Sequence, residues 1–335
     1  MFIVKSYAAA VLFCVVTMLC WGSWGNTQKL AARTWRSELF YWDYVVGIFL
    51  TSLLFAFTLG TLGSEGRSFM DDLRQADSPS LTAAFVGGVV FNLANILLIA
   101  AISVAGLSVA FPVGIGIALV WGVINNYIRV PSGNLGLILT GVLLIAIGII
   151  VNAIAYRRMS QRENKIPTKG LILSVVAGVL MAQFYGFVVE AMTQNFSSPE
   201  GGKLTPYTAI VIFSLGILLS NIIFNTILMK KPVDGDPVTY DMYFKGTLPT
   251  HLTGILGGLI WCVGMTFSII AAERAGPAIS YGLGQGAVLV AALWGVFIWK
   301  EFDSAPKGTG VLLTIMFVCF FAGLGLIVYS KVVPQ

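Results

Sequence analysis

The sequence predicts an all-α integral membrane protein with ten transmembrane helices, arranged as two inverted five-helix repeats. Three observations support this fold class: the composition, the number of long apolar segments, and an internal repeat. Of the 335 residues, 57% are hydrophobic and only 10% are charged, whereas soluble domains carry about 25% charged residues. Because so few charges cannot form a water-exposed surface, lipid must cover most of this one.

Ten apolar segments approach the roughly 20 residues that a helix needs to cross a bilayer. Helices are expected because unpaired backbone groups cannot face lipid. The first segment resembles a signal peptide, but no A-x-A site follows it, so it is interpreted as a retained span. The predicted spans are 7–29, 41–62, 81–102, 108–127, 135–156, 171–192, 208–229, 251–272, 277–299 and 311–329.

An internal repeat relates residues 87–119 to residues 257–289 at a fixed offset of 170. Gly88 falls on Gly258 and Gly106 on Gly276, and shared glycines are harder to obtain by chance than shared leucines. The offset equals five spans, an odd number, so the two copies run in opposite directions. The repeats are predicted at 1–160 and 161–335. Inverted repeats are typical of secondary transporters, although a duplicated rigid membrane protein or a channel would also carry one.

The positive charges predict an orientation. Thirteen of the 20 Lys and Arg residues fall in the connections after the first, third, fifth, seventh and ninth spans. Cytoplasmic loops are enriched in these residues, so both termini are predicted to be extracytoplasmic. The protein is expected to be multi-pass in the cell (inner) membrane. A net charge of +5 fits this bias and requires no nucleic-acid partner.

Several short motifs resemble a known superfamily. They are Trp21-Gly22-Ser23-Trp24, Trp42-Asp43-Tyr44, Ala105-Gly106-Leu107-Ser108, Gly114-Ile115-Gly116-Ile117, Lys169-Gly170-Leu171, Gly257 to Trp261, and Lys300-Glu301. The chain resembles the drug/metabolite transporter superfamily, in the branch of glucose/ribose porters, rhamnose–proton symporters and ureide permeases. This resemblance implies secondary active transport, with proton symport of a small, largely uncharged polar solute. A monosaccharide is the leading substrate class. A purine nucleobase, nucleoside or ureide is the alternative, and export of drugs or metabolites is less favoured.

Polar and aromatic side chains within spans are candidates for binding that solute. Amides offer donors and acceptors that do not ionise, which suits sugars, nucleobases and ureides equally. The same amides also serve as hydrogen-bonding links between helices, and tryptophans form interfacial belts, to which Trp24 is assigned. The candidate binding residues are Trp21, Asn92, Asn95, Gln183, Tyr185, Trp261, Tyr281 and Gln285.

Clustered Gly and Pro at matching places in the fourth and ninth spans indicate a hinge or a close approach to ligand, because they weaken a helix. Pure packing is the alternative. The hinge candidates are Pro112, Gly114, Gly116, Gly282, Gly284 and Gly286.

A proton-coupled carrier needs a group that changes charge, and the candidates within spans are Glu190 and Asp43. Each lies near a helix end, where a carboxylate is usually solvated. The single histidine, His251, is expected to face water. Motifs for metal binding or catalysis are missing from the sequence, so no metal, cofactor or enzymatic activity is expected. The expected partners are the solute, a proton and the lipid bilayer, with the protein a monomer or homodimer.

Overall fold

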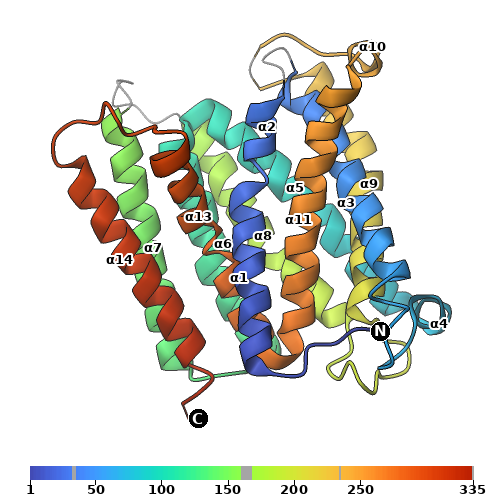
Figure 1. Cartoon of the computed structure of the whole chain (residues 1–335). Coiled ribbons are helices and arrows are strands. Elements are labelled where there is room, and N and C mark those ends of the chain that lie inside the picture. The colour runs from blue at the N-terminus through green and yellow to red at the C-terminus, as the bar shows by residue number, and fades with distance from the viewer. Residues whose placement is uncertain (32–34, 160–167, 234, 334–335) are drawn as a thin grey trace.

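The computed structural model describes residues 1–31, 35–159, 168–233 and 235–333. Within these ranges, ten helices are long and apolar enough to cross a membrane, which confirms the predicted all-α membrane class. They stand side by side (Figure 1), with both termini at one end of the molecule. We call that end the termini side. The opposite end, which carries the connections after the odd-numbered spans, is the loop side.

The first five spans are α1 (Tyr7–Ser23) continued by α2 (Asn26–Leu30), α3 (Ser37–Phe57), α5 (Ser78–Ala105), α6 (Leu107–Arg129) and α7 (Leu135–Met159). Of the other five, four are single helices: α8 (Thr168–Ala191), α9 (Pro206–Lys230), α11 (Leu248–Ala275) and α14 (Thr309–Tyr329). The ninth span is broken into three pieces, which are α12 (Pro277–Gly284), α13 (Ala287–Leu293) and the π-helical η1 (Trp294–Ile298). Two short helices, α4 (Phe69–Gln75) and α10 (Tyr240–Phe244), lie in connections.

The predicted second span lies about four residues too far along the chain. The observed span begins at Ser37 rather than 41 and ends at Phe57 rather than 62. Its first turn is polar, and the Glu38 carboxylate is buried and paired with Arg36 at 2.7 Å. A prediction from hydropathy alone leaves such a polar turn out of the span. The predicted boundary between the repeats, at residue 160, lies outside the described residues.

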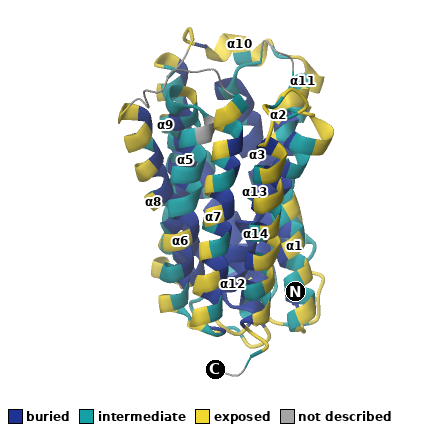
Figure 2. Ribbon diagram, turned by 90° about the vertical axis from the view of Figure 1, so that its left-hand side faces the viewer, coloured by how far each residue is buried: buried dark blue, intermediate teal, exposed yellow. Residues whose placement is uncertain are grey.

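The burial pattern is that of a protein solvated by lipid (Figure 2): exposed residues lie on the outer helix faces and buried ones in the centre. Large apolar side chains such as Leu143, Ile223 and Phe321 are exposed at membrane depth. In water such a surface would be an aggregation or binding patch. Here it is the contact with the bilayer.

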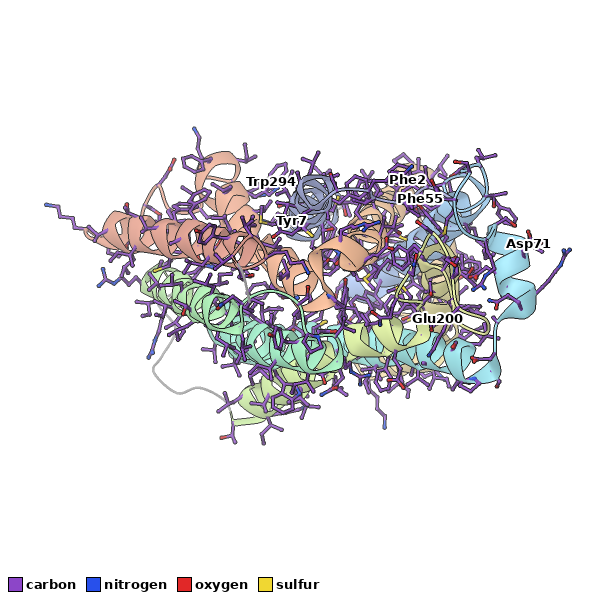
Figure 3. All side chains as sticks on the ribbon, turned by 90° about the horizontal axis from the view of Figure 1, so that it is seen from below. Phe2, Tyr7, Phe55, Asp71, Glu200 and Trp294 are labelled. Atoms are coloured by element: carbon purple, nitrogen blue, oxygen red, sulfur yellow. The ribbon has the colours of Figure 1, made fainter. Side chains whose placement is uncertain are left out.

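Eight of the spans form two bundles. The first bundle contains α1, α3, α11 and α12–α13, and the second contains α8, α9, α5 and α6. Within the first, α11 packs against α1 and α3, and within the second, α5 packs against α8 and α9. The remaining spans, α7 and α14, pack against each other. Figure 3 shows this pair at one end of the molecule, with Asp71 of α4 at the other. Each contact in one bundle thus has a counterpart in the other, as the predicted repeat requires.

Glycines bring the helices of each bundle into backbone contact. A Cβ atom on Gly258 of α11 would lie 2.0 Å from the Tyr44 carbonyl oxygen of α3. A Cβ atom on Gly88 of α5 would lie 2.0 Å from the Phe213 carbonyl oxygen of α9. Real Cβ atoms do not approach this closely, so both crossings require glycine. These two glycines are one of the pairs matched by the repeat.

The same offset relates two one-residue turns. Gly106 joins α5 to α6 with a φ of 80°, and Gly276 joins α11 to α12 with a φ of 91°. Only glycine adopts such angles readily. These turns reverse the chain so tightly that each pair of consecutive spans stays adjacent.

We predict that Gly88→Ala and Gly258→Ala each destabilise the protein, because the added methyl group forces two backbones apart. Overpacking of this kind costs about 1–3 kcal/mol. Thermal unfolding in detergent should show a lower midpoint for both variants. Gly325→Ala is the matched control, since a Cβ there meets no atom within 4 Å. Equal midpoints for all three variants would contradict the close crossings.

Candidate functional site

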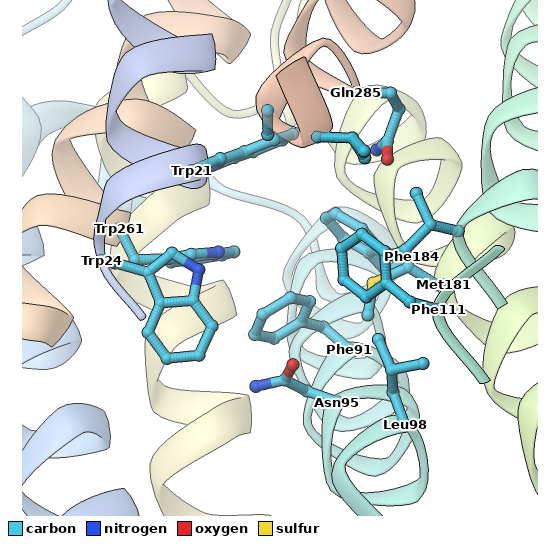
Figure 4. A pocket seen from close by; sticks show the side chains of 13 residues that line it. Trp21, Trp24, Phe91, Asn95, Leu98, Phe111, Met181, Phe184, Trp261 and Gln285 are labelled. Atoms are coloured by element: carbon cyan, nitrogen blue, oxygen red, sulfur yellow. The ribbon is translucent and has the colours of Figure 1, made fainter. Parts of the chain in front are cut away.

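A cavity lies between the two bundles (Figure 4), with about 130 Å³ open to the centres of water-sized molecules. Most of its lining residues sit at the middle of their spans or are displaced from it toward the loop side, whereas Phe184 of α8 is displaced toward the termini side. They are Trp21, Trp24, Phe91, Asn95, Leu98, Phe111, Ile115, Met181, Phe184, Trp261, Gln285, Ala287 and Val288. None of these carries a charge, so the cavity suits an uncharged solute.

The lining comes from equivalent positions of the two predicted repeats. Phe91 and Trp261 are 170 residues apart, and their ring centroids lie 4.4 Å from each other. Ile115 and Gln285 are a second pair at the same offset. Helices α1 and α8 contribute at a common spacing, with Trp21 three residues before Trp24 and Met181 three residues before Phe184. The cavity therefore lies where a two-fold axis relating the halves would pass.

Aromatic rings form most of the wall. Trp21 and Trp261 stack with their planes 13° apart and their centroids at 6.0 Å. Phe91 contacts Phe184 edge to face at 5.1 Å. Behind this wall, the ring of Tyr44 supports Trp24 at 4.6 Å. Rings held by such contacts offer rigid flat faces to a ring-shaped ligand.

Two amides supply the polar groups of the cavity. Figure 4 shows Asn95 and Gln285 at opposite ends of it. Asn95 Nδ2 donates to Tyr41 Oη at 3.1 Å, and its Oδ1 accepts no hydrogen bond from any described residue. The Gln285 side chain likewise has no hydrogen-bond partner in the described part of the chain, although the residue is only 7% exposed. Both amides therefore retain hydrogen-bonding capacity for a ligand.

Asn92 supports the cavity from behind instead of lining it. Its Oδ1 accepts from Tyr41 Oη at 3.0 Å, and its Nδ2 donates to Ser220 Oγ at 2.9 Å. The chain Asn95–Tyr41–Asn92–Ser220 crosses from the second bundle to α3 and back. It fixes the Asn95 amide so that its oxygen faces the cavity.

The structure brings together four of the eight predicted binding residues, namely Trp21, Asn95, Trp261 and Gln285. Gln183 instead accepts a hydrogen bond from Asn125 at 3.2 Å, and Tyr185 and Tyr281 lie in a buried layer described below. Trp24, expected in an interfacial belt, lines the cavity. Sequence reasoning missed the apolar residues Phe91, Phe111 and Phe184, because a phenylalanine within a span carries no signal distinguishing a cavity from lipid. The pairing of Phe91 with Trp261 in the repeat was the one available clue.

The sequence profile described as "Sugar transport protein" matches residues 12–328. The chain belongs to this sugar transport protein family. Ureide permease 4 of Arabidopsis thaliana is 23% identical, over 99% of this chain and 99% of its own. The Listeria innocua protein named "Putative sugar uptake protein lin0444" is 23% identical, over 93% of this chain and 98% of its own.

A crystal structure with 14% sequence identity superposes with a TM-score of 0.61, covering 96% of this chain and 98% of the other. At this identity the match shows a shared fold. Together with the ten spans, the family shows that the protein is a multi-pass membrane transporter, in agreement with the resemblance to sugar porters and ureide permeases that the motifs indicate.

In this family member, a hydrogen-bonded layer closes the cavity toward the termini side. Tyr281 Oη donates to the main-chain oxygens of Ala118 and Met181, each at 3.2 Å. One turn away, Tyr185 Oη lies 3.0 Å from Ser268 Oγ, and Ser280 Oγ donates to the Ser268 carbonyl oxygen at 2.7 Å. All these side chains are fully buried. The layer joins α11 and α12 of the first bundle to α6 and α8 of the second.

The hinge candidates differ between the two halves. The ninth span is broken: α12 ends at Gly284, α13 begins at Ala287, and Gln285 of the cavity lies at the break. The helical hydrogen bonds are thus interrupted beside Gly282, Gly284 and Gly286. In the other half, α6 runs unbroken past Pro112, Gly114 and Gly116. A hinge role for either group remains a prediction.

The two coupling candidates have different surroundings. Glu190 lies at the termini-side end of α8, where it is paired with Arg129 at 2.5 Å and its side chain is 54% exposed. Asp43 is only 2% exposed and accepts a hydrogen bond from Tyr243 Oη at 2.7 Å. Its carboxylate also lies 2.9 Å from His251 Nδ1.

The expectation that His251 faces water was wrong. Its side chain is 18% exposed and is enclosed by Trp35 and Tyr243, whose ring centroids lie at 5.1 and 4.9 Å. Close packing of α3 on α11 brings Asp43 to it, since Gly254 leaves no room for a Cβ atom beside the Asp43 side chain. Burial and the neighbouring Asp43 carboxylate raise the pKa of Tyr243, so its hydroxyl stays protonated and donates.

We predict that Tyr281→Phe opens the closed layer, because two carbonyl oxygens lose their donor. Cys14, fully buried and 3.6 Å from Ser280 Oγ, reports on this layer. In a background lacking the half-buried Cys20 and Cys319, a charged thiol reagent should label Cys14 faster in Tyr281→Phe. The exposed Tyr329 supplies the control substitution Tyr329→Phe. Unchanged labelling of Tyr281→Phe would show that the hydroxyl does not seal the layer.

Proposed function

We propose that this protein is a secondary active transporter that carries a small, uncharged, ring-shaped polar solute through the central cavity. The observation that supports this most is the composition of the cavity: it has aromatic walls from both bundles and, at each end, one amide that retains hydrogen-bonding capacity. Rings stack on the solute faces, and Asn95 and Gln285 bond its edge. A charged solute would leave its charge without a partner, which is costly in a buried site.

A monosaccharide is the substrate class we place first. The apolar face of a pyranose ring suits the indole rings of Trp21 and Trp261, and amides accept from and donate to hydroxyl groups. The description of the matched family also favours a sugar.

A cyclic ureide or nucleobase is the second candidate, favoured by the small number of polar groups. A monosaccharide carries several hydroxyls, and each one buried without a partner costs about 1–3 kcal/mol. A flat ring with amide edges needs fewer partners. Several relatives named ureide permeases align over nearly the whole chain.

We further infer that transport proceeds by alternating access of two inverted halves and is coupled to protons. Counterpart contacts in the two bundles, the matched glycine crossings and the paired cavity residues support this mechanism. In the predicted orientation, with both termini extracytoplasmic, the closed layer faces outward. The cavity is then placed toward the cytoplasm.

We predict saturable counterflow of one ring-shaped solute in proteoliposomes, and a weaker affinity in Asn95→Ala and Gln285→Ala. A hydrogen bond to an uncharged ligand contributes about 0.5–1.5 kcal/mol, so each apparent Kd should rise about 2- to 13-fold. Gln183→Ala should bind as the wild type does, since Gln183 lies outside the cavity.

A sugar, a nucleobase and a ureide should be compared as counterflow substrates. Selective counterflow of a ureide or nucleobase would overturn the monosaccharide assignment and keep the carrier. Ion current without counterflow would indicate a channel. Equal affinities in all three variants would remove the assigned site from the cavity.

A further inference from the structure

An acidic and a basic side chain are buried together where the loop-side ends of α3 and α11 meet α10. Asp43 contributes from the second turn of α3, His251 from the first turn of α11, and Tyr243 from α10. The Asp43 oxygens lie 2.9 and 3.0 Å from His251 Nδ1. With Tyr243 donating to Oδ1 at 2.7 Å, the carboxylate is held from two other elements.

No described Lys or Arg is paired with this carboxylate. The charged groups on the surrounding elements have other partners: Arg36 binds Glu38, Lys245 binds Asp241, and Lys29 binds Glu301. Lys230, at the end of α9, is exposed. The net charge of the cluster is therefore set by whether the Asp43–His251 pair holds a proton. With one proton shared the pair is neutral, and without it the pair carries a buried negative charge.

Buried ionisable groups within membrane spans are costly and usually functional. Only one of the two bundles buries ionisable groups at this crossing. At the offset of 170, the position of α5 equivalent to His251 is Leu81. The matched crossings, Gly258 on Tyr44 and Gly88 on Phe213, place Ile212 of α9 at the position equivalent to Asp43. The fold therefore does not need a charged pair at this crossing, because its counterpart packs with apolar residues.

The two helices that hold the pair also form the cavity wall. On α3, Tyr44 supports Trp24, and Tyr41 orients Asn95 through its hydroxyl. On α11, Trp261 forms the centre of the aromatic wall. A shift of α3 against α11 that follows a change of charge at Asp43 therefore reaches both walls of the cavity.

We propose that the Asp43–His251 pair is the site that binds the coupling proton, an inference that rests on the proposed carrier function. The proton binds the imidazole of His251, which then forms an ion pair with the Asp43 carboxylate. Its loss leaves a single negative charge that is stabilised by water. The unloaded pair thus favours loop-side opening, and the loaded, neutral pair permits closure around the solute.

Assays in proteoliposomes can measure proton coupling separately from solute transport. The wild type should perform solute counterflow and should also accumulate solute when a pH gradient is applied. We expect Asp43→Asn and His251→Gln to keep counterflow and lose accumulation, with solute falling to the level reached without a gradient. Asp241→Asn, which removes an exposed carboxylate from the same helix as Tyr243, should keep both activities.

Several outcomes would overturn the assignment while leaving the carrier intact. Gradient-driven accumulation in Asp43→Asn and His251→Gln equal to that of the wild type is one. Loss of accumulation in Glu190→Gln alone is another, because it would move coupling to the termini side. Wild-type counterflow that never responds to a pH gradient is a third. Lack of counterflow for every solute would instead count against the carrier function.

A measurement without solute tests the pair itself. His251 is the single histidine of the chain, so ¹⁵N-histidine labelling gives one imidazole signal without further assignment. We expect its titration curve to differ between the wild type and Asp43→Asn, and to stay unchanged in Asp241→Asn. An identical curve in the wild type and Asp43→Asn would show that the two groups do not share a proton.

Discussion

The fold depends on backbone-to-backbone contact between helices at glycines. In lipid the hydrophobic effect does not drive helices together, so association relies on close van der Waals packing and interhelical hydrogen bonds. Gly88 and Gly258 permit α5 and α11 to approach their partners to within a distance that any side chain would prevent. The Gly258 crossing also holds α3 against α11, where Asp43 meets His251.

The two halves share this packing but differ in chemistry at equivalent positions. Tyr281 and Ser268, which bond across the closed layer, correspond to Phe111 and Leu98, which line the cavity. One side of the cavity is thus closed by directional hydrogen bonds, and the equivalent residues on the other side are apolar. A carrier with identical gates would have two states of equal energy. In the mechanism we propose, this difference favours closure at the termini side in the empty protein, and protons and solute act against it.

The ten spans could be predicted because bilayer thickness leaves a direct mark on the sequence. The two glycines matched by the 170-residue repeat, Gly88 and Gly258, both lie at close helix crossings. Half of the predicted binding residues line the cavity, and Asn95 and Gln285 could be singled out because they are amides at membrane depth. Tyr185 and Tyr281 looked equally suitable, but their hydroxyls are used between helices, which only the packing reveals. The phenylalanines of the cavity resemble lipid-facing ones. The Asp43–His251 pair joins residues 208 positions apart, and no local pattern indicates such a contact.

In the mechanism we propose, the two halves exchange which side of the cavity is closed. Distances between spin labels, measured by double electron–electron resonance in proteoliposomes, test it directly. Labels at Gln28 on α2 and Ser103 on α5 report on the loop side, and labels at Ala8 on α1 and Ile128 on α6 report on the termini side; all four residues are exposed. On addition of transported solute at acidic pH, we expect a shorter Gln28–Ser103 distance and a longer Ala8–Ile128 distance. Distances that stay fixed, or that change in the same direction at both sides, would contradict it.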